Sequence, residues 1–438
     1  MFGRDPAAAG ILEGVTSKAP IRAIPTGDRA WLLAALTDAL DGGTPVLPVP
    51  DGSETAALSA LQRLPESELP EGTALVILTS GSSGVPKAVA LSASALRASA
   101  EATHERLGGP GQWIVALPTH LISGVQMLVR SIVCGTDPVF FDDPSGRPFD
   151  PAAFLDACDA ADGGSTGRRY VSLVPVQFAR LLELAEQDPE AADRLRAIDG
   201  VLVGGQAVTL EMRRRAHALG VRLRRSYGMT ETAGGCVYDG VEIGDTRVRI
   251  RAGEVQLAGP SLALGYIGDP VLTAEKFVEE VGRDGVPTRW YRTGDAGELL
   301  GGMLTVTGRL DRVLVSGGVN VSLDEIERIA REHEGWDSAV AVRVPDAEWG
   351  ERPGLVVEIA DPTGAARADF DAIRAVIREQ LGAAAAPEWS TEIDRMPRLP
   401  GGKPDLRAID EWIGRLRASF AETRAAGSAA AHSQEDDA

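Results

Sequence analysis

The sequence predicts an α/β fold with a large N-terminal domain of mixed and parallel sheets covered by helices, a β-rich subdomain, and a small α+β C-terminal domain. Three observations predict it. Between residues 74 and 225, apolar runs of strand length alternate with segments of helical period; after residue 240, short strands and glycine-rich turns follow; after Asp311, a new helix-and-strand pattern begins. Such alternation is typical of a parallel sheet with helices on its faces.

Five apolar runs are the candidate strands of the large domain: residues 74–79, 112–117, 138–142, 170–174 and 200–205. They are apolar throughout rather than at alternate positions, so both faces of each strand must be buried, and we expect parallel strands covered by helices. Helices are expected over 176–187, where apolar residues recur every three or four positions, and over 209–220, which begins at Thr209 and ends at Gly220.

A second pattern follows Asp311. Ser322 and Glu325 form a capping box at the start of an apolar-periodic helix. Two strands (338–344 and 354–360), a helix near 368–382 and a last helix from about 405 to 424 complete it. We therefore expect a large domain over 1–310, a small domain over 311–425, and a tail over 426–438 that is disordered because it has nothing to bury.

Composition excludes several classes of protein. The chain has 438 residues, with 44 Lys and Arg against 63 Asp and Glu, and a net charge of −19. This is too acidic for binding nucleic acid or an anionic membrane surface. No signal peptide and no membrane span is evident, and three scattered cysteines suit neither a disulfide framework nor a zinc site. We expect a cytoplasmic protein with small-molecule partners.

The most informative string is TSGSSGVPK, Thr79 to Lys87, directly after an apolar run. Successive small residues let backbone N–H groups point into one concavity, and Lys87 adds a mobile positive charge, which together suit a polyphosphate. The spacing is not that of the G-x-x-x-x-G-K-[ST] nucleotide loop. A flexible linker is the ordinary alternative for such a string.

Four further strings carry polar chemistry: YGMTETAGG (227–235), YRTGD (291–295), GRLDR (308–312) and the turn that holds Lys403. An aromatic ring beside a glycine can stack on a purine, and Glu231 is a hard oxygen ligand suited to Mg²⁺. Asp295 can accept the hydroxyls of a ribose, and Arg309 can brace that sugar or a phosphate. Taken singly, each string is equally compatible with a charged surface turn.

The order of these five strings resembles the adenylate-forming superfamily of acyl-CoA synthetases, peptide-synthetase adenylation domains and luciferases, over residues 70–415. Segments 117–136, 172–182 and 230–240 look like the o-succinylbenzoate:CoA ligases of menaquinone biosynthesis. The resemblance implies an AMP-forming acid–thiol ligase. Such an enzyme converts 2-succinylbenzoate and Mg·ATP into an acyl-adenylate and pyrophosphate, and then forms the coenzyme A thioester and AMP.

The same resemblance implies roles for individual residues. Lys403, His120 and Lys87 would be catalytic, Glu231 the Mg²⁺ ligand, and Asp311 the hinge of a mobile C-terminal domain. ATP would be bound by Thr79, Ser80, Gly81, Ser82, Ser83, Gly84, Lys87, Gly205, Gln206, Tyr227, Gly228, Met229, Thr230, Asp295, Arg309 and Lys403. The acid would be bound by His120, Ser123, Gln126, Ser226, Gly228 and Gly234, with Arg130 as a further donor, and coenzyme A by Gly317 and Gly318.

Two other functions are compatible with the sequence. One is an adenylating enzyme that loads a carrier protein's phosphopantetheine arm; the other is a regulatory nucleotide-binding relative without catalysis, against which Lys87, Glu231 and Lys403 argue. Ser316 and Val319 replace a lysine and a glutamate that many relatives carry, so the coenzyme A contacts stay open. Homodimers are frequent in such enzymes. His104 is expected on a helix surface, in a structural role.

Overall fold

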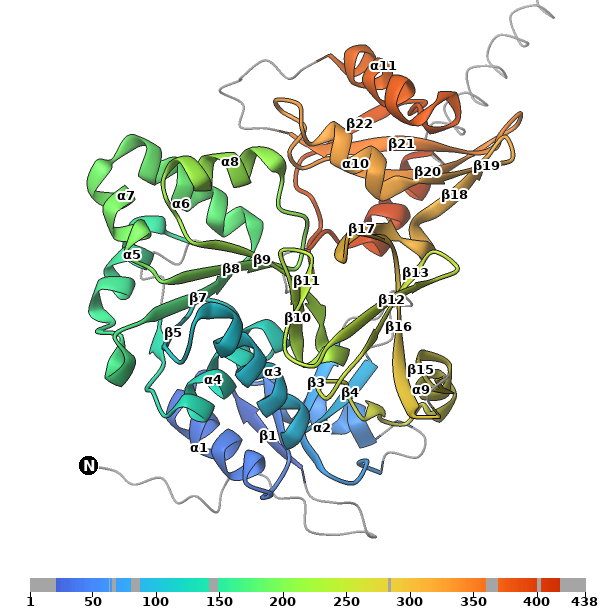
Figure 1. The fold of residues 1–438 in the computed structure, drawn as a ribbon. Coiled ribbons are helices and arrows are strands. Elements are labelled where there is room, and N and C mark those ends of the chain that lie inside the picture. Colours follow the sequence, from blue (N-terminus) through green and yellow to red (C-terminus); the bar gives the residue numbers. More distant parts are fainter. Residues whose placement is uncertain are drawn as a thin grey trace, which may run out of the picture. The chain divides into compact units, whose positions relative to one another are not determined.

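The computed structural model describes residues 21–62, 64, 68–79, 87–141, 149–282, 285–359, 369–399 and 403–417. By its internal contacts the chain divides into two compact units, with the boundary between Val306 and Thr307 (Figure 1). The expected boundary at 310 and 311 and a hinge at Asp311 stay predictions. The expected tail, 426–438, lies outside the described residues.

The first sheet of the large unit has the order β1-β2-β3-β4-β14. Its strands are β1 (Arg22–Pro25), β2 (Val46–Val49), β3 (Thr73–Thr79), β4 (Lys87–Ser92) and β14 (Gly265–Tyr266). Strands β1, β2 and β3 are parallel, whereas β4 runs antiparallel to both β3 and β14. The expectation that the run 74–79 has only parallel neighbours was therefore wrong, because β4 returns directly alongside β3.

The second sheet has the order β11-β10-β9-β8-β7-β5-β6. Its strands are β5 (Gln112–Val115), β6 (Val139–Phe140), β7 (Arg169–Leu173), β8 (Gly200–Gly204), β9 (Leu223–Met229), β10 (Gly234–Tyr238) and β11 (Val241–Glu242). The first five are mutually parallel, and β10 and β11 add antiparallel pairs at one edge. The other four apolar runs all lie here, as predicted.

Helices cover both sheets. They are α1 (Arg29–Leu40), α2 (Glu54–Gln62), α3 (Ala93–Leu107), α4 (Ile122–Cys134), α5 (Pro151–Ala160), α6 (Pro175–Gln187), α7 (Pro189–Arg196), α8 (Leu210–Ala218) and α9 (Pro270–Lys276). The hydroxyl of Thr209 accepts from the Met212 N–H at 3.1 Å and so caps α8 at the residue where the sequence predicts its start.

Alternation along the strands shows why these runs are apolar throughout. In β8, Val201 and Val203 join the core formed with α5 to α8, while Leu202 faces the core formed with α1, α3 and α4. In β3, Leu75 and Ile77 face that same central core, and Val76 faces the α2 side. Each strand therefore buries both faces between helical layers.

A third, β-rich sheet has the order β12-β13-β16-β15, with β17 paired to β16. It belongs to the large unit except for residues 307–309 at the end of β17. Its strands are β12 (Arg247–Arg251), β13 (Glu254–Ala258), β15 (Phe277–Val281), β16 (Pro287–Leu300) and β17 (Met303–Arg309). This agrees with the subdomain expected after residue 240. Its long strand β16 carries the YRTGD string.

The small unit is a sheet with helices on both faces. Its strands are β18 (Val313–Ser316), β19 (Val319–Ser322), β20 (Val340–Asp346), β21 (Gly350–Glu358) and β22 (Ser390–Ile393), and its helices α10 (Leu323–Ala330), α11 (Phe370–Leu381) and residues 406–417. Ser322 caps α10 by accepting from the Glu325 N–H at 3.3 Å, as the sequence predicts. One core lies against α10 and α11, the other against the last helix.

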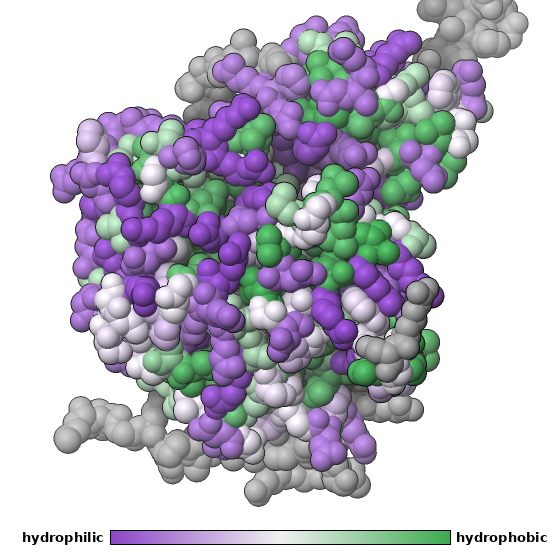
Figure 2. Space-filling model, in the orientation of Figure 1, coloured by the Kyte–Doolittle hydropathy of each residue, from purple (hydrophilic) through white to green (hydrophobic). Residues whose placement is uncertain are grey.

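On the face shown in Figure 2, hydrophilic side chains predominate over the layer of α5 to α8. The described part of the chain contains no helix long and apolar enough to cross a membrane.

Candidate active site

The glycine- and serine-rich string joins two neighbouring strands. Thr79 ends β3 and Lys87 begins β4, where the two residues are register partners and the Thr79 hydroxyl lies 3.4 Å from the Lys87 carbonyl oxygen. Residues 80–86 lie outside the described residues, so the predicted contacts of Ser80 to Gly84 stay predictions. Because Thr79 and Lys87 are register partners, Lys87 lies beside the residue at which the string leaves β3.

Lys87 and Glu231 meet on one tyrosine. The Lys87 Nζ lies 5.6 Å from the centroid of the Tyr266 ring, and the Tyr266 hydroxyl donates to Glu231 Oε1 at 2.8 Å. Tyr266 is buried, and its ring packs on Phe277. Two strings that are 140 residues apart in the chain are thus joined by a residue that the sequence analysis did not select.

Burial and the carboxylate of Glu231 both raise the pKa of Tyr266 far above its usual value. The hydroxyl therefore stays protonated and acts as a donor to Glu231. Gly265 and Tyr266 form the two-residue strand β14, whose adjacent residues are uncharged, so the sequence carried no signal for Tyr266 beyond a glycine–aromatic pair.

A second contact joins the strings at 227 and 291. The Tyr227 hydroxyl donates to Asp295 Oδ2 at 2.6 Å, and Asp295 is buried at the centre of β16. Burial, and secondly the negative charge of Asp295, raise the pKa of Tyr227 well above its usual range. The two residues predicted beside the adenine and the ribose therefore lie within hydrogen-bonding distance of each other.

Glycines let the backbone come close around Tyr227. A Cβ on Gly228 would lie 2.1 Å from the Gly234 carbonyl oxygen, so only glycine permits this pairing of β9 with β10. Ser226 and Met229 lie on the same β9 strand, and Thr230 begins the 3-10 turn that follows it. Gly205 has a φ of 83° directly after β8, next to the exposed Gln206.

His120 lies between β5 and α4, and Ser123 lies in the first turn of α4. His120 is half-buried, and burial lowers its pKa, so its imidazole is mainly neutral near pH 7. Ser123 is exposed. Both residues stand at the carboxyl end of a parallel strand, the edge where open α/β sheets place their ligands.

Gln126 is buried and uses its amide as a donor within the protein. Its Nε2 donates to the Ala233 carbonyl oxygen at 2.7 Å, whereas its Oε1 has no hydrogen-bond partner among the residues that the structure describes. The Gln126 side chain lies beside Gly234, where an added Cβ would be 3.4 Å from its Cγ. The side chain therefore presents an acceptor, not the free donor that the sequence analysis expected.

Arg130, one helical turn further along α4, is a buried cation that forms no ion pair with a carboxylate in the described part of the chain. It is 3% exposed, its guanidinium carbon lies 4.6 Å from the centroid of the Trp113 ring, and its Nε has no hydrogen-bond partner among the described residues. Its other nitrogens lie at the long distances of 3.5 Å from Ser172 Oγ and 3.4 Å from the Tyr238 hydroxyl. Burial lowers its pKa. Within the described ranges no carboxylate forms an ion pair with it.

The expectation that His104 lies on a helix surface was wrong. His104 is buried and accepts from the Trp113 indole N–H at 3.2 Å. Burial, and secondly the charge of Arg130, lower its pKa to about 4. Its structural role is as an acceptor inside the core, which periodicity alone did not reveal.

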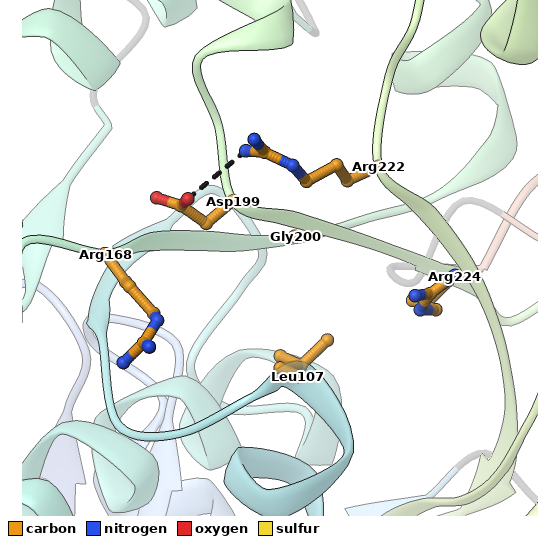
Figure 3. A pocket seen from close by; sticks show the side chains of 6 residues that line it. All are labelled: Leu107, Arg168, Asp199, Gly200, Arg222 and Arg224. Carbon is orange, nitrogen blue, oxygen red and sulfur yellow. Dashed lines mark hydrogen bonds and ion pairs between the residues drawn. The ribbon is translucent and has the colours of Figure 1, made fainter.

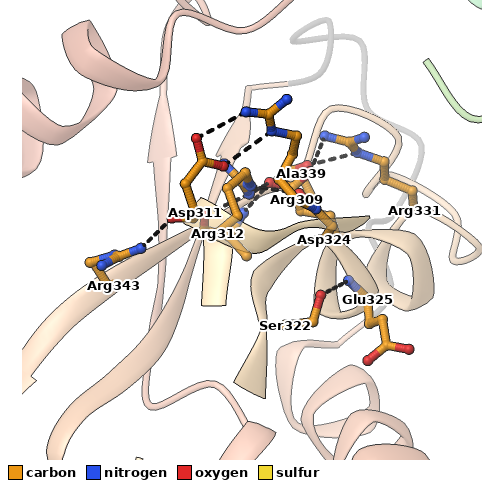
Figure 4. Close-up of polar contacts among 11 residues, drawn as sticks. Arg309, Asp311, Arg312, Ser322, Asp324, Glu325, Arg331, Ala339 and Arg343 are labelled. Atoms are coloured by element: carbon orange, nitrogen blue, oxygen red, sulfur yellow. Dashed lines mark hydrogen bonds and ion pairs between the residues drawn. The ribbon is translucent and has the colours of Figure 1, made fainter. Parts of the chain in front are cut away.

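In the small unit, Arg309 and Asp311 bind each other. The Arg309 guanidinium donates to both carboxylate oxygens of Asp311 at 3.1 Å, and Arg343 donates to the Asp311 carbonyl oxygen at 2.9 Å (Figure 4). Partial burial alone would raise the pKa of Asp311, but the hydrogen bonds from Arg309 outweigh it and the pKa lies below its usual value. The predicted ribose and hinge residues are thus mutually restrained.

Gly317 and Gly318 form the two-residue turn between β18 and β19, with φ values of 55° and 82°. Positive φ at both turn positions is the geometry that glycine favours in a tight hairpin. Ser316 and Val319 flank the turn, and Val315 and Val319 are about half exposed. Lys403 is exposed and its carbonyl oxygen accepts from the Leu399 N–H at 2.8 Å.

A Mg²⁺ ion fits Glu231 only together with other ligands. No cluster of three or more His, Cys, Asp or Glu side chains that could hold a metal occurs among the residues with described positions. Glu231 Oε1 accepts the hydrogen bond from the Tyr266 hydroxyl, which leaves Oε2 of the carboxylate for a cation. Mg²⁺ in nucleotide enzymes commonly takes one or two carboxylates together with phosphate oxygens and water. The residues present therefore fit a shared site.

The sequence profile of a family described as "AMP-binding enzyme" matches residues 34–300, which is more than half of the chain. The chain belongs to the AMP-binding enzyme family. This match confirms the resemblance drawn from the five strings. The fold agrees, with a large N-terminal and a small C-terminal part.

Several curated proteins similar to this family member are named 2-succinylbenzoate--CoA ligase. A "Probable 2-succinylbenzoate--CoA ligase" of Mycobacterium tuberculosis is 36% identical over 391 residues, covering 88% of this chain and 96% of the relative. The 2-succinylbenzoate--CoA ligase of Escherichia coli K12 is 30% identical over 387 residues, covering 84% and 76%. The predicted subfamily resemblance is confirmed.

Solved structures agree on the fold. A single-residue variant of E. coli MenE with bound OSB-AMS aligns with a TM-score of 0.63 and 26% identity, over 85% of this chain and 82% of that one. The amide bond synthetase McbA of Marinactinospora thermotolerans aligns with a TM-score of 0.65 and 26% identity, over 87% and 83%. One fold therefore serves different acceptors, and the site must decide the function.

Proposed function

We propose that this family member is an AMP-forming acid–thiol ligase acting on 2-succinylbenzoate. It uses ATP to form 2-succinylbenzoyl-adenylate and pyrophosphate, and then forms 2-succinylbenzoyl-CoA with release of AMP. The observation that carries the proposal is the meeting of three separate strings in one site, through the contacts Lys87–Tyr266–Glu231 and Tyr227–Asp295. The names of its relatives supply the substrate.

The first half-reaction brings a carboxylate anion to the α-phosphate of a polyanion, so it needs charge neutralisation more than proton transfer. Lys87 and the loop that it ends would hold the β- and γ-phosphates. The Tyr227 segment with Gly205 and Gln206 would enclose the adenine, and Asp295 the ribose. Glu231 would hold a Mg²⁺ ion, which when bound supplies positive charge to the phosphate oxygens.

The second carboxylate of the substrate calls for a cation in the acid pocket, and Arg130 is the candidate that the structure favours. An ion taken out of water costs several kcal/mol unless it is paired. Arg130 is buried, its Nε lacks a hydrogen-bond partner within the described ranges, and Gln126 one turn earlier on α4 lies against Gly234. A bound carboxylate would satisfy that guanidinium. His120, neutral at the strand end, would line the same pocket.

The small unit would serve both half-reactions in turn. Lys403 would neutralise the carboxylate and the bridging oxygen during adenylation, and Gly317 and Gly318 would let the coenzyme A arm pass close to the backbone. Asp311 would be the hinge that exchanges the two roles. A cytoplasmic location and a homodimer remain predictions.

Acid-dependent exchange of pyrophosphate into ATP, followed by mass detection of the thioester, tests the proposal. Purified full-length chain is assayed with 2-succinylbenzoate, benzoate, salicylate and a fatty acid. We expect exchange and thioester with 2-succinylbenzoate, and little with acids that lack the second carboxylate. Arg130→Met should raise the KM for 2-succinylbenzoate at least about tenfold, the effect of losing a charged hydrogen bond, whereas Arg130→Lys should retain part of the affinity.

Three results would contradict parts of the proposal. Exchange without thioester would indicate a different acceptor, such as a carrier protein's phosphopantetheine arm or an amine. Absence of exchange with every acid would indicate a nucleotide-binding relative without catalysis. Equal use of benzoate and 2-succinylbenzoate would remove the role of Arg130 while leaving the ligase chemistry in place.

A further inference from the structure

A hollow of about 300 Å³ opens in the large unit where the parallel strands β7, β8 and β9 begin. It is lined by Leu107, Arg168, Asp199, Gly200, Arg222 and Arg224. Figure 3 shows Arg168 and Arg224 on either side of Gly200 and Leu107, and Arg222 extending to Asp199. Three guanidinium groups therefore surround one small cavity in a chain whose net charge is −19.

The one carboxylate of the cavity is already engaged. Asp199 Oδ2 accepts from the Arg169 backbone N–H at 2.9 Å, and its Oδ1 accepts from Arg222 at 3.2 Å. Arg224 lies 3.7 Å from Asp239, at the limit of an ion pair. Within the described part of the chain, the Arg168 guanidinium has no acceptor. The hollow therefore carries an excess of positive charge that the protein itself does not neutralise.

The inner end of the hollow is closed by apolar groups. A Cβ on Gly200 would lie 3.1 Å from the Tyr170 ring and 3.2 Å from a Leu107 methyl group. The Arg168 guanidinium passes over Gly109, where an added Cβ would be 3.0 Å from its Nη1. Glycines at both positions leave room for the arginine side chain and for a small ligand beside it.

This hollow is separate from the candidate nucleotide site. Strand β8 runs from Gly200 in the hollow to Gly204, next to the predicted adenine residues, and four steps of about 3.3 Å give a separation of roughly 13 Å. Strand β9 likewise begins beside Arg222 and ends at Tyr227 to Met229. A ligand in the hollow leaves the ATP residues free.

We propose that this hollow is a second anion site, which binds a small oxyanion carrying at least two negative charges, such as a di- or polyphosphate or a polycarboxylate. The planar guanidinium fork binds phosphate and carboxylate oxygens through paired N–H donors, which is why arginine is the common residue in such sites. Arg168 and Arg224 hold the ligand from two sides, and Arg222 completes the positive rim.

Calorimetric titration of pyrophosphate and of citrate tests the site at one fixed, low salt concentration. The titrations use the Lys87→Ala variant, in which the cation of the candidate nucleotide loop no longer competes for the probe. The Arg168→Glu substitution is then introduced into this Lys87→Ala variant. Because the Arg168 side chain is exposed and makes no described contact with an acceptor, the folded state should persist, which an unchanged thermal unfolding midpoint verifies.

Arg214→Glu is the matched control, since Arg214 is exposed on α8 and the substitution changes the net charge equally. We expect saturable binding that Arg168→Glu weakens at least tenfold and Arg214→Glu less than threefold. Binding of both probes would define a general oxyanion site, and binding of pyrophosphate alone a phosphate site. Lack of saturable binding of either probe, or equal weakening by the two substitutions, would overturn the proposal.

Discussion

At the scale of single residues, Tyr266 connects two groups that the sequence places far apart. Its ring lies beside the Lys87 ammonium and its hydroxyl donates to Glu231. A positioning role for Tyr266 follows, because the hydrogen bond fixes which oxygen of Glu231 remains for a cation.

Tyr266→Phe keeps the ring and removes the donor. A hydrogen bond to a charged group contributes about 1.5–3 kcal/mol. We therefore expect the Mg²⁺ concentration that gives half-maximal pyrophosphate exchange to rise about 10- to 100-fold, with ATP binding in the absence of Mg²⁺ little changed. Binding of Mn²⁺ in the presence of ATP, followed by electron paramagnetic resonance, provides a readout apart from activity. Tyr291→Phe is the control, since its hydroxyl is 3.5 Å from that of Tyr266 and does not donate to Glu231; equal effects would rule out positioning by Tyr266.

His104 makes stability depend on pH. Its pKa is lowered from 6.5 to about 4 in the folded state, so the unfolded chain binds more protons between these values. The free energy of unfolding should therefore fall as the pH drops from about 6.5 to about 4, and should be insensitive to His104 above that range. The total is of the order of 3 kcal/mol at 1.36 kcal/mol per pKa unit.

His104→Gln retains an acceptor for Trp113 but cannot titrate. Urea unfolding between pH 7 and 4 should show a smaller loss for this variant than for the natural chain. Parallel curves for the two proteins would mean that other groups cause the pH dependence.

At the scale of elements, the β18–β19 hairpin distinguishes two adjacent glycines. Both have positive φ, but a Cβ on Gly317 would lie 2.7 Å from the Trp349 ring, whereas nothing lies within 4 Å of one on Gly318. The left-handed conformation costs an alanine about 1–2 kcal/mol at either position, and the steric clash adds about 1–3 kcal/mol at Gly317 only.

We therefore expect Gly317→Ala to lower the thermal unfolding midpoint of the small unit more than Gly318→Ala does, as measured by calorimetry. Gly318→Ala then becomes the better variant for testing coenzyme A binding, because the unit remains folded. A larger loss from Gly318→Ala would show that the Trp349 contact is not the limiting one.

At the scale of the whole molecule, two substitutions should separate the half-reactions. Lys403→Ala removes a charge needed during adenylation, and the loss of one such focused interaction costs about 10²–10³ in rate; thioester formation from supplied acyl-adenylate should continue. Asp311→Pro fixes φ at the proposed hinge, so pyrophosphate exchange should continue while thioester formation falls. Equal loss of both half-reactions in either variant would contradict the division of roles.

Asp311→Asn is the control for the hinge. It weakens the paired hydrogen bonds from Arg309 without restricting φ. If Asp311→Asn impairs thioester formation as strongly as Asp311→Pro, then the Arg309 contact, and not rotation about residue 311, carries the effect.

Local features of the fold follow from the sequence more closely than the pairing of distant strands does. The runs at 112, 138, 170 and 200 and the caps at Thr209 and Ser322 depend on neighbouring residues, and each lies where periodicity and capping rules predict. The orientation of β3 beside β4 depends on a long-range choice of partner, and there the prediction was wrong in part.

By itself, the sequence determined the fold class, several of the strands and helices, the family, and a candidate set of charged residues, because these depend on periodicity and on short strings. Only the tertiary structure decided which of these residues touch. It placed Tyr266 between Lys87 and Glu231, joined Tyr227 to Asp295, buried His104 and Arg130, and gathered arginines at the opposite strand ends. Contacts between residues far apart in the chain depend on how sheets and helices pack, and local sequence carries no record of that packing.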